Sequence, residues 1–183
     1  MHHFRAPDAR RFISASLMIG IAFVIFGASF GVLSVSAGAS VAQSCAMSLL
    51  VFTGASQMSA VSVIASGGTV ASAFGGAVLL SGRNAVYGLA MSPVLKQGSL
   101  ASRLLGAQWV IDETTAVVSA ETDPATRRTA FWISGAILYA SWNIGTLLGA
   151  LVGSSINPSD FGLDAAFPVM FTAMIAPHLR TSA

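Results

Sequence analysis

The stretch "FISASLMIGIAFVIFGASFGVLSVS" (12–36) decides the class of this protein, because none of its side chains is charged. A helix needs about 20 predominantly apolar residues to cross the hydrocarbon core of a bilayer. The absence of Asp, Glu, Lys and Arg continues to Gly82, and the chain of 183 residues is only 9% charged, against roughly 25% in soluble domains. The sequence therefore predicts an all-α integral membrane protein. Its net charge of +2 is too small to indicate nucleic-acid binding.

Turn-forming residues divide the chain into about six hydrophobic segments between two tails. The predicted spans are 12–36, 40–66, 70–92, 104–120, 129–153 and 163–178. Together they form a polytopic helix bundle, one transmembrane domain over 12–178. Residues 1–11 are expected to form a basic cytoplasmic tail, and residues 179–183 a short C-terminal tail.

The distribution of Lys and Arg predicts the orientation of this bundle, because cytoplasmic loops carry an excess of positive charge. With six crossings and a cytoplasmic N-terminus, Lys96 and Arg103 lie outside. Six basic residues then lie inside: Arg5, Arg10, Arg11, Arg127, Arg128 and Arg180. A re-entrant segment would change this alternation.

Two spans contain polar residues typical of interrupted helices, "FTGASQMSA" (52–60) and "LLSGRNAVYG" (79–88). Irregular backbone at membrane depth is tolerated only inside protein or beside a water-filled cavity. Transporters use such broken helices to present helix ends to a substrate. The alternative for each segment is a continuous helix whose Ser hydroxyls bond to its own backbone. Two such segments in one chain favour a transporter.

The charges inside the spans are candidate functional residues. Placing Arg83 at the centre of a bilayer costs about 2.5–3.5 kcal/mol, so its side chain either extends to the interface or pairs with a carboxylate in the interior. The fourth span offers Asp112 and Glu113. One of them can pair with Arg83 while the other lines a cavity or carries a proton. Alternatively, both acids are solvated at the membrane surface.

Small residues recur one helical turn apart, at Gly27 and Gly31 and again at Gly145, Gly149 and Gly153. In lipid such spacing lets helix backbones approach closely. These glycines pack helices either within the chain or between subunits.

No catalytic or metal-binding constellation is expected. Cys45 is the one cysteine, and His2, His3 and His178 lie near the chain ends, whereas metal sites use three or four ligands and a hydrolase needs a nucleophile beside a base. We therefore expect no cofactor and no enzyme. A passive channel lined by small uncharged residues, or a structural subunit of a membrane complex, remains an alternative to a transporter.

Five motifs in order carry a family resemblance over nearly the whole chain. They are "GASFGVLSVSAG" (27–38), "LVFTGASQMSAVSVIASG" (50–67), "GRNAVYGLAMSPVL" (82–95), "DETTAV" (112–117) and "FGLDAAFP" (161–168). Together they resemble the AzlC family, the large subunit of bacterial exporters of branched-chain amino acids.

The resemblance implies a multi-pass protein of the bacterial inner membrane that exports Leu, Ile and Val, with Met as a further candidate. It also implies a small hydrophobic AzlD-type membrane protein as partner. The positions that match the family's motifs are Gly54, Ser56 and Gln57 in the "GASQ" segment, Arg83 with Asn84 after it, and the acidic pair Asp112 and Glu113. Family members often carry His where this chain has Asn84, so no proton-carrying side chain is implied there.

Overall fold

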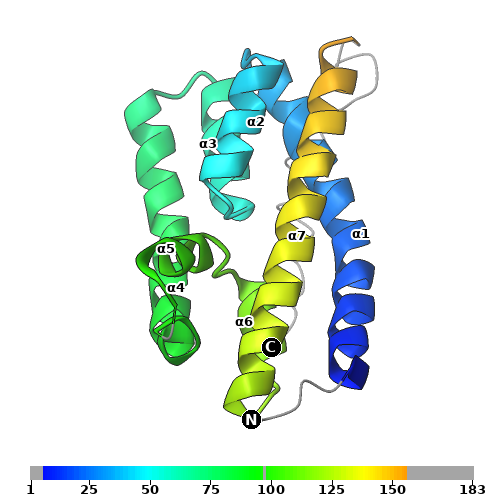
Figure 1. Ribbon diagram of the computed structural model, residues 1–183. Helices are drawn as coiled ribbons and strands as arrows, with labels where there is room; N and C mark the ends of the chain where they lie inside the picture. The colour runs from blue at the N-terminus through cyan, green and yellow to red at the C-terminus, as the bar shows by residue number, and fades with distance from the viewer. Residues whose placement is uncertain (1–5, 97, 156–183) are drawn as a thin grey trace, which may run out of the picture.

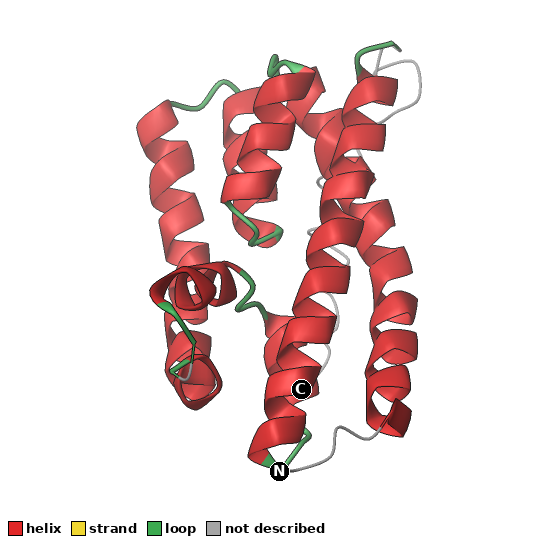
Figure 2. Ribbon diagram, viewed as in Figure 1, coloured by secondary structure: helices red, strands yellow, loops and turns green. Residues whose placement is uncertain are grey.

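The computed structural model describes residues 6–96 and 98–155, and every regular element in these ranges is a helix (Figure 2). In chain order the helices are α1 (Ala6–Ser36), α2 (Val41–Leu50), α3 (Ala55–Ala65), α4 (Val70–Leu95), α5 (Leu100–Gln108), α6 (Asp112–Ser119) and α7 (Pro124–Gly153). The all-α prediction is confirmed. The predicted span 163–178, the tail 179–183 and the first five residues of the N-terminal tail lie outside the described residues.

Three of the predicted spans correspond to single long helices, α1, α4 and α7. Helices α1 and α7 are long and apolar enough to cross a membrane. Helix α4 has 26 residues and is therefore about 39 Å long at 1.5 Å per residue, more than the roughly 30 Å of the hydrocarbon core. Helix α1 begins at Ala6, inside the stretch expected to be a tail.

Helices α1 and α7 lie side by side (Figure 1), and glycines from both helices form their interface. A methyl group added at Gly31 would collide with the carbonyl of Thr146, and one added at Gly149 would collide with the carbonyl of Ala28. Only glycine permits this backbone approach. Both glycine series therefore pack within the chain.

The predicted span 40–66 is wrong as a single crossing, because it forms two short helices. Helix α2 begins beside the end of α1, where Ser44 Oγ donates to Ser34 Oγ at 2.8 Å. It ends against the middle of α7, where Tyr139 Oη donates to the carbonyl of Leu49 at 2.8 Å. Since ten residues of helix span only about 15 Å, α2 reaches about halfway through a bilayer.

Helix α3 then returns to the face that α2 entered (Figure 1). Its first turn contacts the middle of α4, where the hydroxyls of Ser56 and Ser81 lie 2.8 Å apart. The Ser59 hydroxyl, one turn later, lies near Gly76, closer to the start of α4. The predicted interruption of "FTGASQMSA" is thus confirmed, and α2 and α3 form a re-entrant pair.

The predicted span 104–120 is also two helices rather than one. Helix α5 packs beside the end of α4, and the chain turns at Trp109, whose ring lies against Gly135 in the middle of α7. Helix α6 then returns along α7, where Val118 and Phe131 share a buried cluster. At the turn, the extended backbone of Ile111 donates its N–H to Thr114 Oγ1 at 3.1 Å. Carboxylates in the first turn favour a helix start here, because helix N-termini are positive.

The predicted interruption of "LLSGRNAVYG" is wrong, because α4 is continuous from Val70 to Leu95. A glycine inside a helix costs about 1 kcal/mol relative to alanine. A break at membrane depth costs several kcal/mol for each backbone group left without a partner. One or two glycines are therefore insufficient to break this helix.

The re-entrant pair α2–α3 brings the end of α4 to the same end of the bundle as the start of α1. Phe12 of α1 packs in one cluster with Met91 and Val94 of α4. Arg128 at the start of α7 donates to the carbonyl of Val94 at 3.2 Å. We call this the charged end of the bundle.

The charged end also holds Lys96 and Arg103, so their predicted location opposite the other basic residues is wrong. Both line a surface groove with Ser92 and Leu95 at the end of α4. The described residues include seven Lys and Arg side chains, and all except Arg83 lie at this end: Arg10, Arg11, Lys96, Arg103, Arg127 and Arg128. The loops 37–40 and 66–69 at the opposite end contain no charged residue.

Candidate functional site

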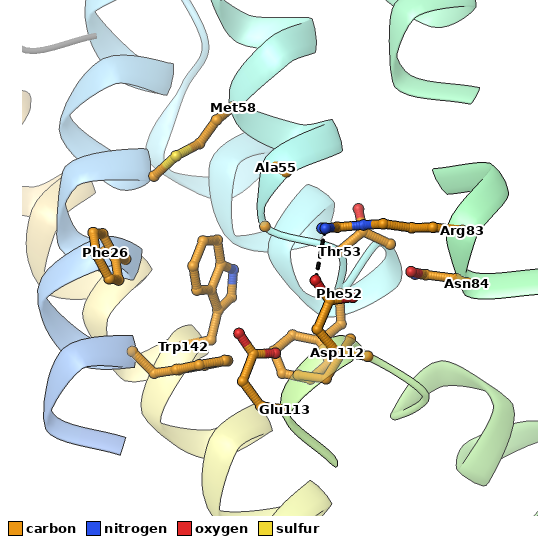
Figure 3. A pocket seen from close by; sticks show the side chains of 13 residues that line it. Phe26, Phe52, Thr53, Ala55, Met58, Arg83, Asn84, Asp112, Glu113 and Trp142 are labelled. Carbon is orange, nitrogen blue, oxygen red and sulfur yellow. Dashed lines mark ion pairs between the residues drawn. The ribbon is translucent and has the colours of Figure 1, made fainter. Parts of the chain in front are cut away.

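Helices α5 and α6 turn beside the middle of α7 and return to the charged end, so they form a second re-entrant pair. A cavity of about 280 Å³ lies where the two re-entrant pairs meet, and we call it the central pocket (Figure 3). Side chains from α1, α3, α4, α6 and α7 and from the α2–α3 connection line it. Its apolar wall consists of Phe23, Phe26, Phe52, Met58, Ile111 and Trp142. Its polar side chains include one cation and two acids, so it combines both signs of charge with a large apolar surface.

Two helices begin at the central pocket. The first is α3, and Gly54 forms its N-cap. Gly54 has φ +51°, in the left-handed region where a residue with a side chain is strained. The N–H of Gly54 donates to Gln57 Oε1 at 3.3 Å, and Gln57 is fully buried. Within the part of the chain that the structure describes, no side chain caps the first-turn amides of α3, and its first turn contains no acid. The positive end of this helix therefore faces the pocket without a protein carboxylate of its own.

The second helix start at the pocket is that of α6, which begins with Asp112 and Glu113. Asp112 Oδ2 accepts an ion-pair contact from Arg83 Nη1 at 2.6 Å, and Arg83 comes from the middle of α4. The side chain of Arg83 is 44% exposed and that of Asp112 is 37% exposed. Figure 3 shows Glu113 beside this pair, with its carboxylate directed into the same space. Arg83 therefore has an acidic partner at the pocket, in the middle of α4, and does not extend to a helix end.

The candidate residues of the sequence divide into two groups. Gly54, Arg83, Asn84, Asp112 and Glu113 line the pocket. Ser56 and Gln57 lie behind it: Ser56 joins α3 to α4 through Ser81, and Gln57 holds the backbone of the α3 tip.

Sequence reasoning did not identify the aromatic wall of the pocket. Phe23, Phe52 and Trp142 pack against one another, with ring centroids 6.0 Å apart for Phe23 and Trp142. Aromatic residues are common in any membrane helix, so their positions carried no distinguishing signal. Within the described ranges, no group of three or more His, Cys, Asp and Glu residues is placed to hold a metal ion.

A family model described as AzlC protein matches residues 18–156, which contain every lining residue of the central pocket. The chain belongs to the AzlC family. It is 26% identical to the inner membrane protein YgaZ of Escherichia coli (strain K12) over 184 residues, which cover 97% of this chain and 75% of YgaZ. No solved structure matches the chain. As an AzlC-family membrane protein, it has a function related to membrane transport.

Proposed function

We propose that this AzlC-family chain is the large subunit of an exporter of branched-chain amino acids, working with a small AzlD-type membrane protein in the bacterial inner membrane. The observation that carries the proposal is the central pocket, in which one cation and two acids adjoin an apolar wall. An amino acid with an aliphatic side chain carries a group that complements each of these features: a carboxylate for the cation, an ammonium for the acids and an apolar group for the wall. The motifs that resemble AzlC support the choice of substrate and partner.

The size and lining of the pocket suit such a substrate. A volume of about 280 Å³ is just below the range for sites that bind drug-sized molecules, which is roughly 300–1,000 Å³, and therefore suits a smaller ligand such as an amino acid. Phe52 and Met58 are 3% and 5% exposed, so a polar substrate side chain placed against them would lose its hydration without gaining a hydrogen bond. This wall favours Leu, Ile, Val and Met over polar amino acids.

The Arg83–Asp112 pair provides a coupling step. A guanidinium holds a carboxylate with two parallel hydrogen bonds, and an incoming substrate carboxylate competes with Asp112 for that position. Displacement frees the Asp112 carboxylate to bind the substrate ammonium or a proton. Substrate entry and a change of charge on Asp112 are then linked.

The basic residues support a cytoplasmic location for the charged end. Six of the seven Lys and Arg side chains among the described residues lie there, and cytoplasmic loops are enriched in such residues. This orientation places the start of α1 in the cytoplasm. The re-entrant pair α2–α3 then enters from outside the cell and α5–α6 from inside.

The test is efflux of labelled Leu, Ile, Val and Met from preloaded cells that express the chain with and without its AzlD-type partner. We expect saturable, gradient-dependent efflux that requires both proteins and is lost in Arg83→Ala. Arg103→Ala is the matched control, because it removes a cation of α5 that does not line the central pocket. Efflux that does not saturate and ignores the gradient would indicate a channel, and efflux unchanged by the chain would contradict the proposal.

A further inference from the structure

The two re-entrant pairs give the central pocket two helix starts from opposite faces of the bundle. The order of one long helix followed by two short ones occurs twice, as α1–α2–α3 and as α4–α5–α6 (Figure 1). In each repeat the second short helix begins at the pocket, at Gly54 and at Ile111. Inverted repeats with discontinuous helices are typical of secondary transporters, whose substrates bind between such helix ends.

The two helix starts differ in charge. A helix N-terminus carries about half a positive charge. At α3 this charge has no acid in the first turn, and Figure 3 shows the Arg83 guanidinium beside Thr53 and Ala55. At α6 the first turn carries two acids, Asp112 and Glu113. The pocket thus has a positive pole at α3 and a negative pole at α6.

An independent observation points to a ligand at the positive pole. Trp142 is only 4% exposed, it lines the pocket, and its Nε1–H has no hydrogen-bond partner among the residues that the structure describes. Figure 3 shows this nitrogen on the side of the ring that faces Arg83 and Asp112. Leaving a buried donor unpaired costs about 1–3 kcal/mol. An indole N–H can only donate, so the group that satisfies it is an acceptor and not an ammonium.

We propose that the pocket binds an amino acid in one fixed orientation, and this inference rests on the proposed function. The α-carboxylate lies at the positive pole, held by Arg83, the first-turn amides of α3 and the Nε1–H of Trp142. The α-ammonium lies at the negative pole, between Asp112 and Glu113. Asp112, which now contacts Arg83 at 2.6 Å, stands in for the substrate carboxylate when the site is empty.

The orientation is tested with leucine and two analogues that each lack one charged group. The first, 4-methylpentanoate, lacks the ammonium, and the second, 3-methylbutylamine, lacks the carboxylate. Dissociation constants are measured by isothermal titration calorimetry on the complete complex of the chain and its partner in lipid nanodiscs. We expect the wild-type complex to bind leucine at least about tenfold more tightly than either analogue, because a hydrogen bond to a charged group contributes about 1.5–3 kcal/mol.

Two variants test the contributions of the positive and the negative pole to binding separately. Trp142→Phe keeps an aromatic ring and removes the N–H, so it weakens binding of leucine and 4-methylpentanoate about tenfold and leaves 3-methylbutylamine unchanged. Glu113→Gln weakens leucine and 3-methylbutylamine and leaves 4-methylpentanoate unchanged. Trp132→Phe is the matched control, because Trp132 is on α7 but does not line the pocket, and it should alter none of the three.

The outcomes distinguish this inference from the proposed function. If leucine binds and is exported, but Trp142→Phe weakens the amine as much as the acid, or the analogues bind as tightly as leucine, the orientation is overturned and the exporter stands. If the wild-type complex does not bind leucine, both are overturned.

Discussion

Removing either side of the Arg83–Asp112 pair should destabilise the protein, and removing both should cost little more than removing one. The contacting atoms are 2.6 Å apart, which places the charge centres about 4 Å apart. At an effective dielectric constant of about 20 the attraction is about 4 kcal/mol. Because the side chains are 44% and 37% exposed, and fully exposed pairs contribute only about 0.2–1 kcal/mol, we expect a coupling energy of about 2 kcal/mol.

The assay is a double-mutant cycle on Arg83→Ala, Asp112→Asn and the double variant. Free energies of unfolding are measured in one detergent by tryptophan fluorescence. Each single variant should lose about 2 kcal/mol, and so should the double variant, because either single change already removes the whole interaction between the two side chains. Arg83→Lys should retain most of the stability but lose most of the export, because an ammonium lacks the planar fork.

The matched control combines Arg103→Ala with Asp112→Asn. Arg103 is an exposed cation on α5 that does not line the central pocket, so these two changes should add within about 0.5 kcal/mol. If Arg83→Ala and Asp112→Asn are equally additive, the pair does not contribute to the fold, and the exchange of Asp112 for a substrate carboxylate loses its basis.

Three further predictions test the architecture. Gly149→Ala should destabilise the protein by about 1–3 kcal/mol through overpacking against α1. Gly82→Ala should be neutral or stabilising, because a methyl group there meets no atom of the described residues within 4 Å. Thermal unfolding of the two variants in detergent compares them. Gly54→Ala should cost about 1–2 kcal/mol, because φ is +51° there, and should reduce leucine efflux. Cysteines introduced at Lys96 and at Arg10 in a cysteine-free background should react with a membrane-impermeant thiol reagent from the same side, and labelling from opposite sides would contradict the re-entrant pair α2–α3.

The membrane class and the first helix break could be predicted because both depend on local sequence. The charge-free run from Phe12 to Gly82 excludes a soluble surface. Gly54, followed three residues later by Gln57, gives a flexible N-cap and a side chain that bonds back to it. Arg83, Asp112 and Glu113 were recognisable as candidates because charges in apolar spans are rare. Family motifs added Asn84.

The topology could not be predicted, because it depends on how far each apolar segment reaches before turning. Residues 40–66 are long enough to cross a bilayer, and nothing in their composition distinguishes a crossing from a re-entrant pair. The break before Asp112 was missed because Trp109, Val110 and Ile111 are as apolar as the rest of the segment. Its one local signal is Thr114, whose hydroxyl bonds back to the Ile111 amide. Misassigning residues 40–66 as a crossing reverses the loops that follow, so Lys96 and Arg103 were placed at the wrong end. Misassigning residues 104–120 in the same way reverses the order again, so Arg127 and Arg128 were placed correctly.

The energetic problem of a charged site in a membrane also limits how the site can work. Arg83 alone would cost about 2.5–3.5 kcal/mol at the bilayer centre, and Asp112 offsets that cost when no substrate is present. A much stronger pair would exclude a substrate carboxylate, and a much weaker one would leave the cation unpaired between transport events. A pair whose side chains are both about two-fifths exposed lies between these limits. Replacing Asp112 by a substrate carboxylate exchanges one anion for another at Arg83, so the net cost is small. The displaced Asp112 carboxylate remains beside Glu113 at the start of α6, and two neighbouring anions there favour the arrival of a cation. In the proposed exporter, an ammonium on the same substrate molecule would supply it, so the site would select a zwitterion over a simple acid.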